Sequence, residues 1–153
     1  VLISDTDERQ VSIWSARGAF LEAIKASTSE MEECDVVVPR NHVADFVKYT
    51  KQVERDVGVR LSGFGHAGDG NLHVYVLRDD FAPETYACKL NEAFDLLYAK
   101  ARALGGQVSG EHGIGFAKKA FLAESLGEVS ISLLRSIKRA FDPNGILNPG
   151  KVC

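Results

Sequence analysis

The chain has 153 residues, enough for one domain with its own core, and its 45% hydrophobic and 25% charged residues are ordinary for a globular protein. The net charge of −3 argues against a nucleic-acid-binding surface, and no apolar run approaches the roughly 20 residues that cross a bilayer. Three widely spaced cysteines and no signal peptide favour a reduced, cytoplasmic chain. Because the chain starts at Val1 and enters a helical pattern almost at once, we expect residues 1–153 to be a piece of a longer protein.

The first half of the chain predicts two helices and three strands. We expect a helix from a cap at Asp5–Asp7 to about Ser27, a strand over Cys34–Pro39, a helix capped by Asn41 and ended by Gly58, and strands over 59–68 and 70–78. In the first helix, Val11, Trp14, Leu21 and Ile24 recur at helical spacing, so we expect them to form a buried stripe.

The second half predicts a long helix over about 84–104, ended by Gly105–Gly106, and then a strand over 107–113. Helices over 116–126 and 129–141 and a turn-rich tail follow. The strand–helix–strand–strand–helix–strand order between Cys34 and Ser109 predicts an α+β fold with a ferredoxin-like antiparallel sheet flanked by helices.

The stretch GFGHAGDGNLHV predicts a hairpin that pairs two histidines. If Asp69-Gly70 forms a two-residue type I′ turn, His66 lies directly opposite His73, with Cβ atoms about 5 Å apart. Alternation then places Phe64 and Tyr75 on the same face as the histidines. Two facing imidazoles suit a divalent metal such as zinc, iron or manganese, while the alternative is a hydrogen-bonded or exposed pair.

A second segment, SGEHGIG, adds Glu111 and His112, whose side chains point to opposite sides in an extended chain. One of them can complete a metal site with the two histidines and leave coordination positions open for a substrate. His112, if free, is then available as a base near neutral pH. The alternative is a surface glutamate beside a structural histidine.

Arg17 lies inside the apolar stripe of the first helix, so we expect it to be buried with an anionic partner. That partner is either a carboxylate of the protein or a substrate carboxylate held by two hydrogen bonds. Lys118 and Lys119 are expected to be solvated surface charges.

Three segments, GHAGDGNLH, GEHGIGFAKK and FDPNGILNPGK, follow one another in the order and spacing of a known family. On these motifs the chain resembles the C-terminal region of the FAD-linked oxidases typified by the glycolate oxidase flavoprotein subunit, D-lactate dehydrogenases and D-2-hydroxyglutarate dehydrogenase. The resemblance covers nearly the whole chain. It implies the cap domain of a vanillyl-alcohol-oxidase-type flavoprotein, whose FAD-binding domain lies upstream and is absent here.

The resemblance also implies roles for individual residues. His66, His73 and Glu111 would hold the divalent metal, His112 would take the hydroxyl proton of a small 2-hydroxy acid, and Arg17 would hold the substrate carboxylate. Hydride would pass from the substrate Cα to the flavin.

Asn71 and Asn148 would lie near the flavin. The partners implied are the protein's own N-terminal FAD domain and an electron-transfer subunit, through which the protein would attach at the inner face of the membrane. The chain alone, without flavin, is expected to be inactive.

Two positions depart from the members that resemble the 2-hydroxyglutarate enzymes. Glu33 stands where those members have Lys, and Leu21 stands where they have Thr. Both changes remove partners for a second carboxylate, which favours a monocarboxylate such as glycolate or D-lactate. Two other functions stay open, a metal-dependent hydrolase that uses His66, His73 and Glu111, and a non-catalytic ferredoxin-like binding module.

Overall fold

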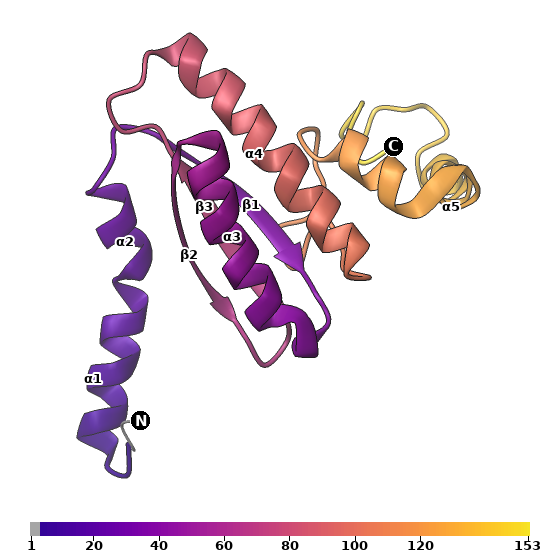
Figure 1. Ribbon diagram of the computed structural model, residues 1–153. Helices are drawn as coiled ribbons and strands as arrows, with labels where there is room; N and C mark the ends of the chain where they lie inside the picture. The colour runs from indigo at the N-terminus through magenta and orange to yellow at the C-terminus, as the bar shows by residue number, and fades with distance from the viewer. Residues whose placement is uncertain (1–3) are drawn as a thin grey trace.

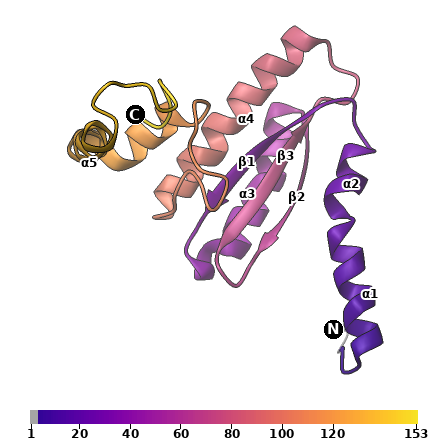
Figure 2. The same cartoon turned by 180° about the vertical axis from the view of Figure 1, so that it is seen from behind.

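The computed structural model describes residues 4–153 as a small sheet with helices on one face and a helical arm on either side (Figure 1). Its elements are α1 (Asp7–Gly18), α2 (Phe20–Lys25), β1 (Met31–Val37), a 3-10 helix (Arg40–His42), α3 (Val43–Val57), β2 (Arg60–His66), β3 (Asn71–Leu77), α4 (Pro83–Ala103) and α5 (Lys119–Phe141). The predicted α+β class is confirmed. Figure 2 shows the opposite face of the sheet, which neither α3 nor α4 covers.

The sheet is antiparallel in the order β1-β3-β2, so β3 is its central strand and is buried along its whole length. The strand predicted over 107–113 is reduced to one bridge, in which Gln107 pairs with Val37 at the outer edge of β1. Farther along, the amides of residues 110–112 donate to the side chain of Asp35 instead of to a neighbouring strand, so the strand does not continue there.

The β2–β3 hairpin has a different register from the predicted one. His66 pairs with Asn71, and Phe64 lies opposite His73. The loop therefore has four residues instead of two, and the Asp69 amide closes its turn on the His66 carbonyl at 2.9 Å. A shift of two residues leaves every side chain on its predicted face, so His66 and His73 are diagonal neighbours.

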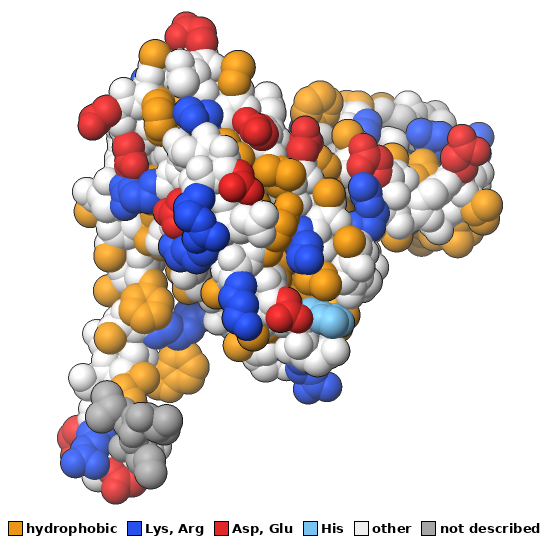
Figure 3. Space-filling model, in the orientation of Figure 1, with side chains coloured by type: hydrophobic (Ala, Val, Ile, Leu, Met, Phe, Trp, Pro, Cys, Tyr) orange, Lys and Arg blue, Asp and Glu red, His pale blue; other side chains and the backbone are white. Residues whose placement is uncertain are grey.

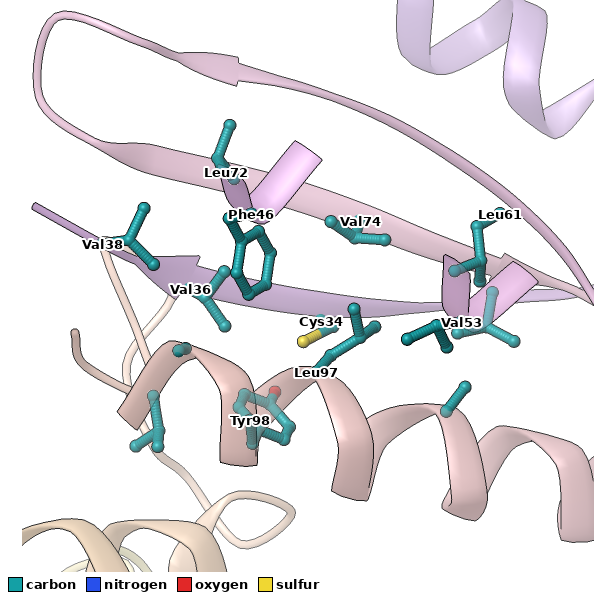
Figure 4. Packing of buried hydrophobic residues seen from close by; sticks show 14 of the residues in the cluster. Cys34, Val36, Val38, Phe46, Val53, Leu61, Leu72, Val74, Leu97 and Tyr98 are labelled. Atoms are coloured by element: carbon teal, nitrogen blue, oxygen red, sulfur yellow. The ribbon is translucent and has the colours of Figure 1, made fainter. Parts of the chain in front are cut away.

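The core lies between the sheet and helices α3 and α4 (Figure 4). Cys34 and Val36 of β1 and Val74 of β3 point toward Phe46 of α3 and Leu97 of α4. These apolar residues alternate along the strands with polar residues on the opposite face, as expected for a sheet with one covered side.

The predicted first helix is two short helices that break at Gly18–Ala19. The predicted burial of its stripe is wrong at the N-terminal end, where Val11 is 69% and Trp14 is 66% exposed. The arm formed by α1 projects away from the sheet, and its hydrophobic side chains lie on the surface (Figure 3). Nothing in the described chain covers that stripe along α1.

The other helices keep their predicted places with small changes at the ends. The predicted Asn41 cap is wrong, because Asn41 lies in the 3-10 helix and α3 starts after His42 without a side-chain cap. Gly58 ends α3 in the left-handed conformation, as predicted. Gly127 breaks α5 between the two helices predicted there. Of the helices in residues 4–153, none combines the length and the apolar character needed to cross a membrane.

Candidate metal centre

The predicted ligand set comes together on the uncovered face of the sheet. His66 projects from β2 and His73 from β3, and Glu111 reaches them from the segment that follows α4. Glu111 Oε1 lies 3.2 Å from His73 Nε2 and 3.6 Å from His66 Nε2. The two imidazole rings have centroids 5.7 Å apart and are nearly perpendicular. The three predicted ligands therefore lie together, although His66 and His73 are diagonal neighbours and not directly opposite each other.

The spacing of these atoms fits a metal ion. Two bonds of about 2.1 Å at tetrahedral angles separate their ligand atoms by about 3.4 Å, close to the distances around Glu111. His73 is flanked by carboxylate oxygens at both nitrogens, Glu33 at 2.7 Å and Glu111 at 3.2 Å. A ring that donates from Nδ1 turns the Nε2 lone pair toward Glu111, and a cation between these two atoms would stabilise that contact. His66 and Glu111 remain partly exposed, so a substrate can reach such an ion.

His112 lies next to the ligand set and is 47% exposed. Its Nδ1 is 3.2 Å from Glu33 Oε1, and its Nε2 is 3.8 Å from Glu111 Oε1. The expectation that Glu111 and His112 point to opposite sides is wrong, because residues 110–112 form a bend rather than a strand. Both side chains therefore approach His73.

Sequence reasoning names Glu33 only as a departure from the 2-hydroxyglutarate pattern and misses its contacts with His73 and His112. The predicted strand starts at Cys34, whereas β1 starts at Met31 and places Glu33 on the same face as His73. The available signal was the apolar alternation of Cys34, Val36 and Val38, which puts Glu33 and Asp35 together on the opposite face.

Asp35 holds the segment that carries Glu111 and His112. Its fully buried carboxylate accepts from Ser109 Oγ at 2.8 Å, from the amides of residues 110–112 at 3.0 to 3.3 Å, and from Lys118 Nζ at 3.4 Å. Burial alone would raise the pKa of Asp35, but these hydrogen bonds and the Lys118 charge outweigh it and lower the pKa to about 2. Lys118 is only 13% exposed and so is not the solvated charge predicted for it.

Arg17 reaches the edge of this site from α1. Its Nη2 lies 3.3 Å from His66 Nε2, and its guanidinium is 6.0 Å from the centre of the Trp14 ring. The predicted burial is wrong, since Arg17 is half-buried, and no acidic side chain within residues 4–153 lies at ion-pair distance from it. The guanidinium can therefore bind a carboxylate from outside the chain.

The two asparagines differ in their positions. Asn71 is buried, and its Oδ1 has no hydrogen-bond partner among the described residues. It lines a cavity of about 470 Å³ with His66 and Glu111, and its amide lies so close to Gly110 that a Cβ on that glycine would overlap it. Asn148 is exposed and lines a separate cavity between α5 and the tail, so the structure brings Asn71 to the site but not Asn148.

The sequence matches one protein family and several named proteins. The family described as FAD linked oxidases, C-terminal domain, matches residues 1–152. The chain is 49% identical over 153 residues to a D-lactate dehydrogenase of Anaerostipes hadrus and 34% identical over 152 residues to the glycolate oxidase subunit GlcD of Bacillus subtilis (strain 168). It is also 32% identical to a D-2-hydroxyglutarate dehydrogenase of Xanthomonas citri pv. viticola. Each match covers at least 99% of the chain but only 32% of the relative, so the chain spans about a third of their length.

Proposed function

Because the chain belongs to the family of C-terminal domains of FAD linked oxidases, we propose that it forms the substrate side of the active site in a flavin-dependent dehydrogenase or oxidase of small 2-hydroxy acids. The observation that carries this proposal is the convergence of His66, His73 and Glu111 beside His112 and Arg17, whose guanidinium has no acidic partner among residues 4–153. The FAD-binding domain would belong to the remainder of a longer protein, since the relatives are about three times as long.

The chain's own residues suit three tasks. His66, His73 and Glu111 would hold a divalent metal that polarises the substrate hydroxyl and carboxylate. Arg17 would fix the carboxylate, and fixing both groups removes much of the orientational entropy of the reaction. His112 would take the hydroxyl proton as the 2-hydroxy acid is oxidised to a 2-oxo acid. FAD, when bound, would accept the hydride from the substrate Cα.

The surroundings of the site favour a monocarboxylate such as D-lactate or glycolate. Glu33 and Leu21 occupy the two positions where the 2-hydroxyglutarate-type pattern supplies Lys and Thr. The Glu33 carboxylate lies within 3.2 Å of both His73 and His112, so a second substrate carboxylate there would meet a like charge. The higher identity to the D-lactate dehydrogenase than to the D-2-hydroxyglutarate dehydrogenase supports the same choice.

Anaerobic flavin reduction by the full-length protein tests this function. We expect D-lactate or glycolate to bleach the flavin absorbance and D-2-hydroxyglutarate to do so much more slowly. His112→Ala should slow the reduction about 100-fold or more, the usual contribution of a general base. Arg17→Ala should raise the substrate concentration needed, while Arg9→Ala, which removes an exposed arginine on the same helix, should not. A flavin that none of the three acids reduces would refute the substrate class.

The cellular location and the partner subunit of the full-length protein belong to the same proposal. We place it in the cytoplasm, with an electron-transfer subunit that brings it to the inner face of the membrane. Fractionation of cells that have or lack the electron-transfer subunit would test this. If the share of the protein in the membrane fraction is the same in both, the proposed attachment is contradicted. The isolated chain should reduce no dye with any 2-hydroxy acid, because the hydride acceptor is not part of it.

A further inference from the structure

Glu33 is a second carboxylate, besides Glu111, that contacts both His73 and His112. It lies on β1 opposite Tyr75 of β3, on the same face as the candidate metal centre, and its side chain is 22% exposed. Its Oε1 atom is 2.7 Å from His73 Nδ1 and 3.2 Å from His112 Nδ1. Neither the sequence motifs nor the proposed function gives this residue a role at the metal.

The contacts of Glu33 indicate how the two rings are oriented. An ionised carboxylate only accepts, so His73 donates to Glu33 from Nδ1 at 2.7 Å, and His112 turns its Nδ1 toward the same oxygen at 3.2 Å. Nε2 of His73 then carries the lone pair and lies 3.2 Å from Glu111 Oε1, and Nε2 of His112 lies 3.8 Å from that atom. Glu33 and Glu111 thus lie on opposite sides of the two rings, with every Nδ1 toward one carboxylate and every Nε2 toward the other.

Tyr75 of β3 lies directly opposite Glu33 on this face of the sheet and is almost fully buried. The pairing of β1 with the central strand therefore places the Glu33 side chain beside His73.

We propose that Glu33 is a positioning residue that sets the tautomer and the orientation of His73 as a metal ligand and of His112 as a base. This inference rests on the proposed function, because it assigns Nε2 of His73 to the metal and Nε2 of His112 to the substrate hydroxyl. A single side chain would in this way couple metal binding to proton transfer. A carboxylate behind a metal-binding histidine commonly raises the basicity of that ligand.

A different role for Glu33 is that of a metal ligand, since Glu33, His73 and His112 also offer ligand atoms that all lie within 4.8 Å of one another. The distances favour positioning. A separation of 2.7 Å is that of a charge-assisted hydrogen bond, and it is shorter than the roughly 3.4 Å between two ligands of one tetrahedral ion. A Glu33 variant should keep the number of metal ions bound per chain if Glu33 is a positioning residue, and should lose one if Glu33 is a ligand.

Metal binding by the full-length protein distinguishes them. Zn²⁺ and Mn²⁺ affinity would be measured by chelator competition, and metal content at saturation by elemental analysis, for Glu33→Gln, Glu33→Ala and the control Glu32→Gln. Glu32 is the exposed neighbour of Glu33 on the opposite face of β1. We expect affinity to fall about 10- to 100-fold in Glu33→Ala and less in Glu33→Gln, which can still accept a hydrogen bond. The control should match the wild type, and the metal content at saturation should not change.

Long-range proton–nitrogen NMR spectra of histidine-labelled protein provide a readout that does not depend on activity. The spectra should show His73 and His112 with the proton on Nδ1 in the wild type and a mixture of tautomers in Glu33→Ala. Unchanged tautomers together with unchanged metal affinity would overturn the proposal, and a metal equivalent lost at saturation in Glu33→Gln would make Glu33 a ligand instead. If the wild type binds no metal, the metal centre itself is refuted, while the tautomers still decide whether Glu33 positions the rings.

Discussion

Replacing Asp35 with Ala should release the segment that carries Glu111 and His112. The substitution removes an acceptor shared by Ser109, three successive amides and Lys118, and it leaves the ammonium group unpaired in a largely buried place. Removing one partner of a buried ion pair typically costs about 3–5 kcal/mol. Because the lost contacts all belong to residues 109–118, we expect most of this loss to lower the free energy of local unfolding of that segment.

Hydrogen exchange followed by mass spectrometry on the full-length protein measures this opening. A loss of about 3 kcal/mol corresponds to exchange that is faster by a factor of about 100 in peptides covering residues 109–113. Asp56→Ala is a suitable control, since Asp56 is an exposed aspartate on α3. If peptides covering residues 109–113 exchange in folded Asp35→Ala as slowly as in the wild type, Asp35 does not hold the segment.

The same carboxylate predicts a dependence of stability on acid. Its pKa is about 2 in the folded chain and 3.8 when unperturbed, so the folded state binds its proton less readily than the unfolded state. The stabilisation, about 2 kcal/mol from a shift of this size, is therefore complete above pH 4 and is lost as the pH falls toward 2. Denaturation midpoints of Asp35→Asn should lack this loss between pH 4 and pH 2. An equal acid dependence in the wild type and the variant would contradict the assignment.

The remaining predictions concern cysteine chemistry and one glycine. Burial raises the pKa of the Cys34 thiol to about 12, so a thiol reagent at pH 8 should label the exposed Cys88 and leave Cys34 unmodified until the chain unfolds, as peptide mapping would show. Gly110→Ala should destabilise the chain by about 1–3 kcal/mol and weaken metal binding, because its Cβ would overlap the Asn71 amide. Gly18→Ala, at a glycine with open space around it, should change neither the urea midpoint nor the metal affinity by more than a small amount.

The sequence determined which face of the sheet each strand residue occupies, and through this the ligand set. Alternation along β2 and β3 has a period of two, so the two-residue error in the hairpin register left His66 and His73 on the predicted face. The family motifs supplied Glu111 and His112. The element order, the Gly58 end of α3 and the break near Gly127 were also readable, because helix period and glycine chemistry are local properties.

The tertiary structure alone decided how those residues meet. The hairpin loop has four residues rather than two, and a bend around Asp35 replaces the expected fourth strand, since a buried carboxylate competes with a neighbouring strand for the amides of residues 110–112. Glu33 becomes part of the site only because β1 pairs with β3 in the register that places it opposite Tyr75. Pairings between residues about 40 positions apart are set by the packing of the whole sheet, and no local pattern in the sequence records them.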